Sequence, residues 1–549
     1  MKHTKLIIIG GVAGGATAAA RARRMDEEAE IILLERGEYI SFANCGLPYY
    51  VGEVIKKRQD LLVTTPEALK KRYRIDVRTF CEVKAIDRTL KRVSVFNQKT
   101  QETYWETYDK IILAPGAEPL KPPLEGINLP GIYNLRNIPD TDRIKNHVDK
   151  KNPKSAVIVG GGFIGLEMVE NLVQRGVRTT IVEMADQVMP PLDKEMAQMV
   201  RNHLEAKGVV CKLGKGVKGF RKERDSLIVS VQEDQDIACD MVILSIGIRP
   251  ENRLAKEAGL EIGKSGGIKV NTAMQTSDPD IYAVGDAVEV REFVTGFPLI
   301  SALAGPANKQ GRIAADNALG RKTVFRGTMR TSIVKIFELT VGSAGLSEKT
   351  LRTYGLPYQV SYTYSGSHAD YYPGAETMTI KLIFSPGNGK VLGAQIIGKD
   401  GVDKRIDVLA TAVHGGMTVF DLEELELAYA PPYSSAKDPV NIAGFVASNL
   451  IRGDAENIYP QELAELDPQT HILLDVRSKM EIRVLGALDG AISIPIDDLR
   501  DHLKELDKEK TYIVYCAVGQ RAYNGYRILA QNGFRARNLS GGFLTYQLF

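Results

Sequence analysis

The stretch SAVIVGGGFIGLEMVENLVQRG (155–176), followed by RTTIVEM (178–184), decides how this chain folds. Its first residues are apolar, as in a buried strand, and the apolar spacing after Phe163 is that of a helix. Between them, Gly160, Gly162 and Gly165 match the GxGxxG turn that holds a nucleotide pyrophosphate at a helix N-terminus. The stretch therefore predicts a strand–turn–helix–strand unit that binds a dinucleotide.

The acid that ends the second strand indicates which dinucleotide binds. Glu183 stands 23 positions after Gly160, where a carboxylate accepts hydrogen bonds from a ribose hydroxyl and repels a 2′-phosphate. No Arg follows within the next few residues. We therefore expect NADH, with NADPH as the alternative. Gly247, in the strand-like stretch DMVILSIGIRPE (240–251), is expected to line the same site.

A second stretch of the same kind stands nearer the N-terminus, as KLIIIGGVAGGATAAARARR (5–24) followed by EIILLERG (30–37). Its turn contains Gly10, Gly14 and Gly15, and Val12 replaces the middle glycine of the pattern. Glu35 is the corresponding acid. One glycine turn alone has roughly even odds of being only structural. Two turns in βαβ-like contexts indicate two nucleotide-binding folds.

Length, charge and cysteine content narrow the class of protein. A chain of 549 residues exceeds one hydrophobic core, so several domains are expected. The formal charge of +3 gives no reason to expect nucleic acid or a membrane surface as a partner. The five cysteines are odd in number and lack CxxC spacing, which argues against a disulfide scaffold or a zinc site and favours a reducing cytoplasm.

The apolar run Leu6 to Ala20 is interpreted as a buried strand and a glycine turn rather than a signal peptide, because Arg21, Arg23 and Arg24 follow it. No uncharged apolar run of 18 residues is found. We expect a soluble cytoplasmic protein without a membrane span and without a metal ion.

The segment TSDPDIYAVGDAVE (276–289) resembles the second flavin-binding motif of flavoproteins with two dinucleotide domains. The resemblance implies that Asp286 holds the ribityl chain of FAD. A role for Asp286 as a cap of the next helix is compatible with this one. The implied FAD contacts are Gly10, Gly14, Gly15, Glu35, Arg36, Val83, Asp286 and Ala304.

The segment SFANCGLPYY (41–50) resembles the signature of the coenzyme A-disulfide reductases and their single-cysteine relatives. Cys45 is then the redox thiol, and a helix N-terminus and a flavin beside it are expected to lower its pKa. Glutathione-reductase-like enzymes carry a second cysteine five positions on, where this chain has Tyr50. We therefore expect a mixed disulfide with a small thiol, or a sulfenate, during turnover. The related NADH peroxidases carry a histidine in place of Ala13, which argues against peroxide chemistry.

The other cysteines fall into two groups. Cys81, Cys211 and Cys239 lie in strand-like or variable-looking stretches and are interpreted as small apolar residues. Cys516 belongs to a different motif near the C-terminus.

The same resemblance implies a homodimer that binds coenzyme A. HADYYPGA (368–375) and YAPPYSSAKDPVN (429–441) are similar to segments whose tyrosines approach the cysteine of the partner subunit. The matching residues, Tyr371 and Tyr429, either donate a proton to the leaving thiolate or merely pack. The implied coenzyme A contacts are Arg21, Arg24, Ser41 and Asn44. A solvated helix face is an equally good interpretation of the two arginines.

The C-terminal part resembles a rhodanese domain in four segments: ILLDVRSKMEI (472–482), GAISIPIDDL (490–499), YIVYCAVGQRAYNGYRIL (512–529) and LSGGFLTYQ (539–547). Cys516 begins the loop CAVGQRA, whose backbone N–H groups and Arg521 are expected to hold an anionic persulfide. Asp475 and Arg477 are expected to support the scaffold. Related phosphatase loops are one residue longer, so this loop favours sulfur over phosphate. A docking module without chemistry is the alternative.

These segments predict an α/β chain with two Rossmann-like dinucleotide-binding domains for FAD and NAD, an α+β dimerisation domain, and a C-terminal α/β rhodanese domain. The expected boundaries are 1–112 and 251–326 for the FAD domain, 113–250 for the NAD(P)H domain, 327–449 for the dimerisation domain, 450–458 for a linker and 459–549 for the rhodanese domain.

We expect an enzyme in which NADH, through FAD, reduces coenzyme A persulfide, polysulfide or coenzyme A disulfide at Cys45, while Cys516 transfers sulfane sulfur. A plain coenzyme A-disulfide reductase with an independent rhodanese is the first alternative. A flavoprotein that passes electrons to another protein is the second, and it leaves Cys45 without a role.

Overall fold

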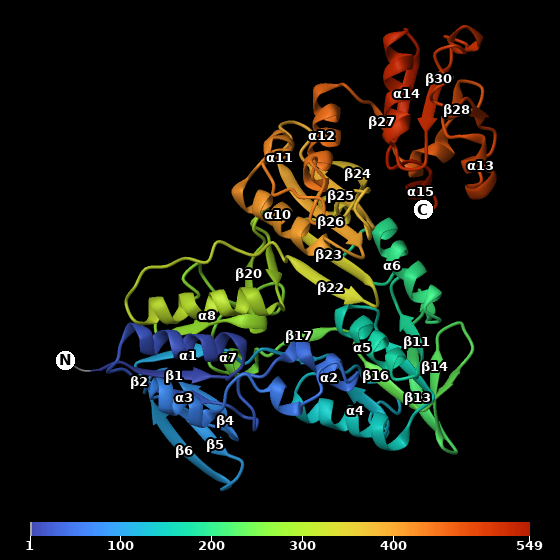
Figure 1. The fold of residues 1–549 in the computed structure, drawn as a ribbon. Helices are drawn as coiled ribbons and strands as arrows, with labels where there is room; N and C mark the ends of the chain where they lie inside the picture. Colours follow the sequence, from blue (N-terminus) through green and yellow to red (C-terminus); the bar gives the residue numbers. More distant parts are fainter. Residues whose placement is uncertain (1–2) are drawn as a thin grey trace. The chain divides into compact units, whose positions relative to one another are not determined.

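The computed structural model describes residues 3–549, which form two compact units (Figure 1). The first consists of the chain up to residue 186 together with residues 207–330. The second consists of residues 187–206 together with residues 331–549. The segment 187–206 therefore belongs to a different unit from the sequence on either side of it.

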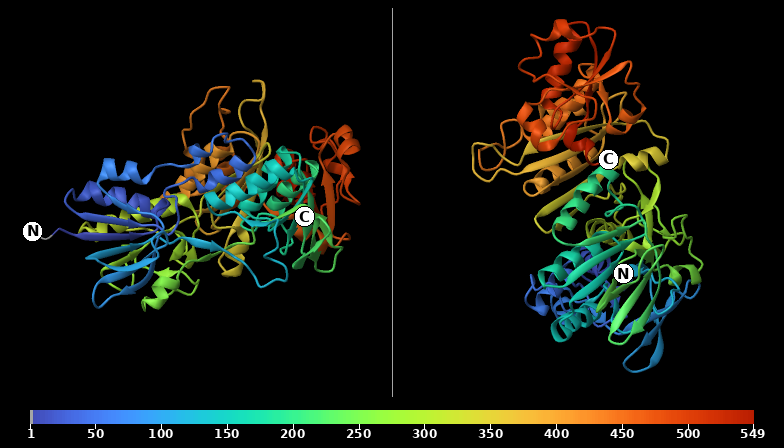
Figure 2. Two further views of the ribbon diagram at one scale, coloured as in Figure 1. Left: turned by 90° about the horizontal axis from the view of Figure 1, so that it is seen from below. Right: turned by 90° about the vertical axis from the view of Figure 1, so that its right-hand side faces the viewer.

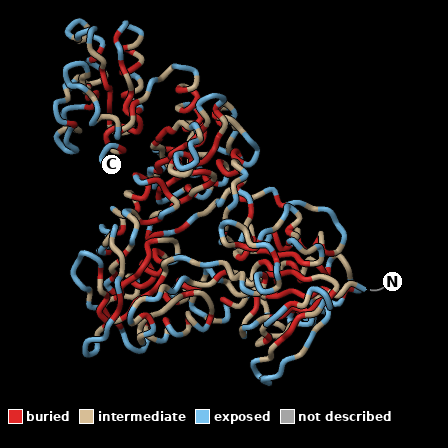
Figure 3. The backbone as a smooth tube through the Cα atoms, turned by 180° about the vertical axis from the view of Figure 1, so that it is seen from behind, coloured by how far each residue is buried: buried red, intermediate tan, exposed pale blue. Residues whose placement is uncertain are grey.

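The first unit contains two parallel five-stranded sheets, and the N-terminal glycine turn belongs to the first of them. Across this sheet the strands are β19 (Ile281–Ala283), β7 (Lys110–Leu113), β1 (Lys5–Ile9), β2 (Glu30–Leu34) and β3 (Asp76–Arg78). All neighbouring pairs are parallel. The central strand β1 is almost wholly buried, as its continuous apolar run requires, and Figure 3 shows the buried backbone following such strands.

Two helices that are distant in the sequence pack together on this sheet. The helices α1 (Ala13–Met25) and α8 (Ala304–Ala318) lie side by side (Figure 1). A Cβ atom on Gly311 would lie 2.2 Å from the carbonyl oxygen of Gly14, so the two backbones touch directly. Nearby, the Arg21 guanidinium donates to the largely buried Asp316 carboxylate at 2.6 Å.

The second sheet of this unit repeats the construction of the first. Across it the strands are β12 (Val210–Leu213), β11 (Arg178–Glu183), β10 (Ser155–Val159), β16 (Met241–Leu244) and β9 (Ile132–Asn134). All are parallel to their neighbours. Its helices are α4 (Ile138–Lys151) and α5 (Phe163–Gln174).

Smaller elements connect and extend these sheets. The chain passes from one five-stranded sheet to the other after β7 and again after β16. The strands that follow, β8 (Ala117–Pro119) and β17 (Ile248–Pro250), pair with each other in antiparallel fashion. Two antiparallel meanders are β4 (Cys81–Asp87), β5 (Arg92–Asn97), β6 (Glu102–Thr107), and β13 (Val217–Glu223), β14 (Ser226–Val231), β15 (Ile237–Cys239). The remaining strands and helices are β18 (Ile268–Lys269), β20 (Val288–Arg291), β21 (Pro298–Ile300), α2 (Leu47–Val51), α3 (Pro66–Tyr73) and α7 (Arg253–Glu257).

The second unit is built around an antiparallel sheet. Its strands, in spatial order, are β22 (Ser332–Ile336), β23 (Leu339–Gly345), β26 (Val391–Gly398), β25 (Thr377–Phe384) and β24 (Gln359–Gly366). The helices α10 (Val402–Gly415) and α12 (Pro439–Arg452) pack against it, in the yellow and orange part of Figure 2. The other helices are α6 (Lys194–Ala206), α9 (Glu348–Thr353) and α11 (Val419–Glu424).

A buried lysine joins the segment 187–206 to this sheet. Lys381 on β25 has no exposed surface, and its Nζ lies 3.0 Å from Asp193, 2.6 Å from Glu195 and 2.7 Å from Glu348. Desolvation lowers the pKa of Lys381, but the surrounding charges outweigh it and hold that pKa well above its usual value. The ion cluster therefore holds α6 and α9 against the sheet.

The C-terminal part of the second unit is a parallel sheet flanked by helices, drawn in red in Figure 2. Its strands are β27 (Asn457–Ile458), β31 (Arg535–Leu539), β30 (Thr511–Tyr515), β28 (His471–Asp475) and β29 (Ile492–Ser493). Its helices are α13 (Lys479–Leu485), α14 (Gln520–Gln531) and α15 (Gly542–Tyr546).

The connection into this part is shorter than the predicted linker 450–458. Helix α12 continues to Arg452, and Gly453 ends it in the left-handed conformation. Asn457 and Ile458 already pair with β31, so only residues 453–456 lie outside regular structure. The sequence did not predict this edge strand, because two residues are too few to show an alternating pattern.

None of the helices between residues 3 and 549 has the length and hydrophobicity that a membrane span requires.

Replacing Lys381 with Met tests the ion cluster. The change leaves three carboxylates buried without their counter-charge, so we expect the β24–β26 sheet to lose about 3–5 kcal/mol of stability. Hydrogen exchange of the β25 amides, followed by mass spectrometry, measures this loss. The matched control is Lys399→Met, because Lys399 pairs with Glu376 at the surface, where a pair contributes about 0–1 kcal/mol. Equal effects of the two changes would contradict the assigned role.

Candidate functional site

The first glycine turn passes through a space that admits no side chain. Gly10 has φ of +100°, and a Cβ atom on it would lie 2.2 Å from the carbonyl oxygen of Ala114. A Cβ atom on Gly15 would lie 1.8 Å from the carbonyl oxygen of Gly10. Glu35 folds back on the turn and accepts the N–H groups of Gly11 at 2.9 Å and Gly37 at 2.8 Å.

The second turn has the same construction. A Cβ atom on Gly160, whose φ is +108°, would lie 2.4 Å from the carbonyl oxygen of Ser245. Glu183 accepts the N–H groups of Gly161 at 2.7 Å and Ala185 at 2.8 Å. A Cβ atom on Gly162 would meet no atom within 4 Å. This open space at the N-terminus of α5 fits a bound pyrophosphate.

The remaining residues predicted to contact FAD are placed in different ways. Arg36 lies 3.4 Å from the Glu251 carboxylate and 3.6 Å from that of Glu118. The side chain of Val83 is buried in the core, so only its backbone is available to a ligand. Ala304 is exposed at the first position of α8, where backbone N–H groups are free for an anion.

Asp286 lies in the short 3-10 helix η3 (Gly285–Ala287). Burial raises the pKa of its carboxyl to about 6, and the charge of Arg136 opposes that shift. Among residues 3–549, no hydrogen bond is made to the Asp286 carboxyl. A carboxyl group in this state fits hydroxyl donors from a ligand, such as those of a ribityl chain.

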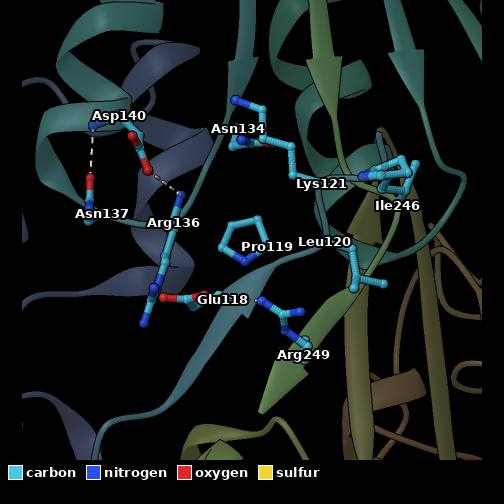
Figure 4. A pocket seen from close by; sticks show the side chains of 11 residues that line it. Glu118, Pro119, Leu120, Lys121, Asn134, Arg136, Asn137, Asp140, Ile246 and Arg249 are labelled. Carbon is cyan, nitrogen blue, oxygen red and sulfur yellow. Dashed lines mark hydrogen bonds and ion pairs between the residues drawn. The ribbon is translucent and has the colours of Figure 1, made fainter. Parts of the chain in front are cut away.

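A cavity of about 540 Å³ lies beside the paired strands β8 and β17 (Figure 4). Its walls carry charged and polar groups from Glu118, Lys121, Asn134, Arg136 and Arg249, and Ile246 lines it as well. Ile246 precedes Gly247, so the cavity borders the predicted NADH site. Gly247 itself has φ of +107°, and its carbonyl oxygen accepts the N–H of Leu120.

Arg136 is a candidate ligand residue that the sequence reasoning missed. Its backbone N–H donates to Asp140 at 3.1 Å, and burial lowers the pKa of its guanidinium. Its charge acts on Glu35 and Asp286, the acids of the two predicted FAD motifs. The segment NLRNIPD (134–140) matches no nucleotide motif, so only the folded arrangement reveals this cation.

Cys45 lies in the 3-10 helix η1 (Asn44–Gly46), directly before α2. Its residue surface is exposed to solvent, but the protein surrounds the thiol closely enough to desolvate it. This desolvation, followed by the charges of Glu167 and Asp286, raises the pKa of Cys45. The expectation of a lowered pKa is therefore wrong for the protein alone, because the thiol is desolvated and two negative charges add to that effect.

Glu167 was not singled out by the sequence reasoning, although it stands two positions after Gly165. Burial raises the pKa of its carboxyl to about 7. The Tyr49 hydroxyl donates to Glu167 at 3.4 Å, a long hydrogen bond. A group that titrates near neutrality beside the thiol is suited to exchange a proton there.

The residues predicted to bind coenzyme A have different surroundings. Ser41, with φ of +46°, and the exposed Asn44 both precede Cys45 in the chain. Arg21 is only 12% exposed and is paired with Asp316. Arg24 is exposed, lies over the ring of Tyr73 at 5.3 Å, and donates to its hydroxyl at 3.0 Å. Arg24 therefore presents its charge to solvent, whereas the charge of Arg21 is largely balanced.

Tyr371 and Tyr429 lie together in the second unit. The loop after β24 carries Tyr371, and the segment between α11 and α12 carries Tyr429. Their hydroxyl oxygens are 2.7 Å apart, and both rings are exposed, as is that of Tyr433. Exposed aromatic rings with a free hydroxyl edge suit a subunit interface.

The C-terminal loop begins at Cys516, directly after β30. Cys516 is fully buried, and the Gly519 N–H donates to its sulfur at 3.2 Å. Arg521 lies in the first turn of α14, and its guanidinium binds both carboxylate oxygens of Glu481. The predicted scaffold pair, Asp475 and Arg477, is buried and joined at 2.6 Å.

Comparison with known proteins identifies three matching family models. The pyridine nucleotide-disulphide oxidoreductase model matches residues 4–311, its dimerisation-domain model matches residues 331–439, and a rhodanese-like domain model matches residues 459–548. Coenzyme A disulfide reductase of Staphylococcus haemolyticus is 36% identical over 452 residues, which cover 81% of this chain and all of that protein.

Two solved structures match nearly the whole chain. Reduced Bacillus anthracis CoADR-RHD is 48% identical, with a TM-score of 0.98, and covers 100% of this chain and 98% of that one. A NAD-dependent persulfide reductase from A. fulgidus is 39% identical, with a TM-score of 0.92, and covers 99% of each chain. These matches confirm the predicted fold class and the resemblance to the disulfide and persulfide reductases that carry a rhodanese domain.

Replacing Glu167 with Gln tests its effect on Cys45. Glu167 is ionised above about pH 7, and its negative charge raises the pKa of the thiol. Without that charge, the thiolate should form at lower pH. The rate of Cys45 alkylation by iodoacetamide as a function of pH, followed on the Cys45 peptide by mass spectrometry, measures the shift. Glu27→Gln, an exposed change in the same unit, should leave the profile in place. An unchanged profile in Glu167→Gln would show that the two groups do not interact.

Proposed function

Because the chain belongs to the pyridine nucleotide-disulphide oxidoreductase family, we propose that it uses NADH and FAD to reduce a sulfur–sulfur bond of coenzyme A at Cys45. The substrates are coenzyme A persulfide, polysulfide or coenzyme A disulfide. The observation that carries the proposal is the accessible Cys45, which interacts with Asp286 and Glu167 and has no second cysteine nearby among the described residues. The same chain also contains the Cys516 loop.

The two glycine turns and their acids would hold the dinucleotides. Gly10, Gly14, Gly15, Glu35 and Asp286 are the proposed FAD contacts, and Gly160, Gly162, Gly165, Glu183 and Gly247 are the proposed NADH contacts. FAD, when bound, supplies the two-electron transfer between NADH and the sulfur bond. Arg136 interacts electrostatically with the acids of both FAD motifs, and its positive charge suits a diphosphate.

Cys45 acts as the nucleophile in this proposal. Its thiolate attacks the inner sulfur of coenzyme A persulfide, the S–S bond breaks, and hydrosulfide leaves with the electron pair. The Cys45–coenzyme A disulfide that forms is then cleaved by two electrons that originate from NADH. Glu167, which titrates near pH 7, is placed to take up the proton of the Cys45 thiol.

The tyrosine pair favours a homodimer in which each subunit completes the site of the other. The exposed hydroxyls of Tyr371 and Tyr429 share one hydrogen bond, so one O–H remains to donate outward. In the proposed dimer this hydroxyl faces Cys45 of the second subunit and protonates the departing coenzyme A thiolate. The dimerisation-domain match supports this assembly.

Cys516 is proposed to carry sulfane sulfur between donors and a coenzyme A thiol. The buried sulfur at the base of the loop receives one backbone N–H, which stabilises an anionic persulfide. The coenzyme A persulfide formed in this way is the substrate for Cys45. The coupling distinguishes the proposal from a plain coenzyme A-disulfide reductase with an independent rhodanese.

Two serine variants test the separate roles of Cys45 and Cys516. Cys45→Ser should abolish NADH oxidation with coenzyme A persulfide and with coenzyme A disulfide, because both need the nucleophile. Cys516→Ser should keep the disulfide activity but lose NADH oxidation that is driven by an external sulfane donor and free coenzyme A. Steady-state kcat/KM for the three substrates measures this. Retained persulfide turnover in Cys45→Ser would refute the mechanism, and electron transfer only to a protein acceptor would favour the flavoprotein alternative.

The preference for NADH over NADPH is tested by changing Glu183, the last residue of β11. Glu183→Gln combined with Met184→Arg removes the acid and adds a cation beside it, because Met184 is exposed. The ratio of kcat/KM for NADPH to that for NADH should rise by at least about tenfold, since one charged hydrogen bond contributes roughly 1.5–3 kcal/mol. Met184→Arg alone is the control for the added charge. No change in the double variant would mean that Glu183 does not contact the ribose.

A further inference from the structure

We propose that Glu481 determines the donor specificity of the Cys516 loop. By neutralising Arg521, it selects a singly charged persulfide over a doubly charged donor such as thiosulfate. The inference rests on the proposed sulfur transfer at Cys516, and it names the donor class and the residue that imposes it.

The first observation is that Glu481 already binds the guanidinium of Arg521. One guanidinium nitrogen lies 2.8 Å from Glu481, and the second binds the other carboxylate oxygen. Such two-point pairs are the strongest arginine–carboxylate arrangement. Glu481 is also fixed by Ser478, whose N–H and hydroxyl donate to it at 3.0 and 2.9 Å.

The Glu481 carboxyl group is ionised at any pH near neutrality. Its hydrogen bonds with Arg521 are the main cause that lowers the pKa of the Glu481 carboxyl to about 2. Arg521 in turn responds to the Cys516 sulfur, which helps to raise its pKa after Glu481. Arg521 therefore interacts electrostatically with both Glu481 and the Cys516 sulfur.

The balance of charge at the loop limits which anions bind. Glu481 balances most of the charge of Arg521, so the site offers an anion the backbone N–H of Gly519 and a guanidinium that is already paired. A persulfide carries one charge that these dipoles can stabilise. Thiosulfate carries two, and its outer charge would face the carboxylate of Glu481 without a free cation.

The surface next to Glu481 suits an organic donor. Met480 and Val484, on either side of Glu481 along α13, are 76% and 77% exposed. The neighbouring Leu485 and Ile492 are partly exposed as well. Apolar side chains contact the carbon skeleton of a thiol carrier and offer nothing to an inorganic dianion.

The transfer itself is balanced without an added oxidant or reductant. The Cys516 thiolate attacks the terminal sulfur of a donor R–S–SH, and the S–S bond breaks. The R–S⁻ thiolate leaves with the electron pair, and Cys516 holds the terminal sulfur as a persulfide. Glu481 takes no part in these bonds, so it is a specificity-determining residue rather than a catalytic one.

The test compares two donors in the full-length holoenzyme, with cyanide as the sulfur acceptor. The donors are thiosulfate and 2-hydroxyethyl persulfide, whose persulfide group carries its only charge, and the readout is the ratio of their kcat/KM values. The wild type should favour the persulfide. In Glu481→Gln, the ratio of thiosulfate to persulfide should rise at least about tenfold, since one nearby charge has been removed. Gln is accepted at this capping-box position, so helix α13 should still form.

Inhibition by sulfate gives a second measurement, and its inhibition constant should fall in Glu481→Gln by a similar factor. The matched control is Glu509→Gln, because the Glu509 side chain is 92% exposed on the same domain and should leave both quantities unchanged.

The outcomes separate this inference from the proposed function. If the wild type transfers sulfur from both donors and Glu481→Gln leaves the ratio unchanged, the role of Glu481 is wrong and the role of Cys516 stands. If neither donor supports transfer, or if Cys516→Ser transfers as well as the wild type, the proposed function of Cys516 fails and this inference fails with it.

Discussion

The nucleotide sites depend on one constraint, the close approach of backbone segments at the two glycine turns. At each turn the first glycine lies against a neighbouring strand connection, and the last lies against the first, at separations that no Cβ atom permits. Only this path lets α1 and α5 begin directly at the strand ends with their N–H groups open. The same path brings the second-strand acids, Glu35 and Glu183, onto the turn amides.

Balanced charge is the second common feature of the candidate sites. Arg21 is paired with Asp316, and Arg521 is paired with Glu481. Cys45 differs, because the charges that raise its pKa, those of Glu167 and Asp286, are both negative. Burial of the thiol and these two charges both raise the pKa of Cys45, which lowers the fraction of reactive thiolate.

The two candidate sulfur sites differ in how far their cysteines are exposed to solvent. Cys45 is accessible and sits in a short helical turn, where substrates of various sizes can reach it. Cys516 is fully buried in a loop that ends in a helix, and its sulfur accepts the backbone N–H of Gly519. The first arrangement suits reduction of a bulky coenzyme A derivative, and the second suits protection of a labile persulfide from solvent.

The sequence by itself determined the features that a few consecutive residues encode. The glycine turns, the acids that follow them, the single Cys45 and the Cys516 loop are each complete within about 30 residues, because backbone geometry and motif spacing are local properties. Only the tertiary structure decided which charges are free. Arg21 meets Asp316 across 295 positions and Arg521 meets Glu481 across 40, while Glu167 and Asp286 reach Cys45 from other elements. Because the field at a group is a sum over neighbours in space, no pattern along the chain predicts it.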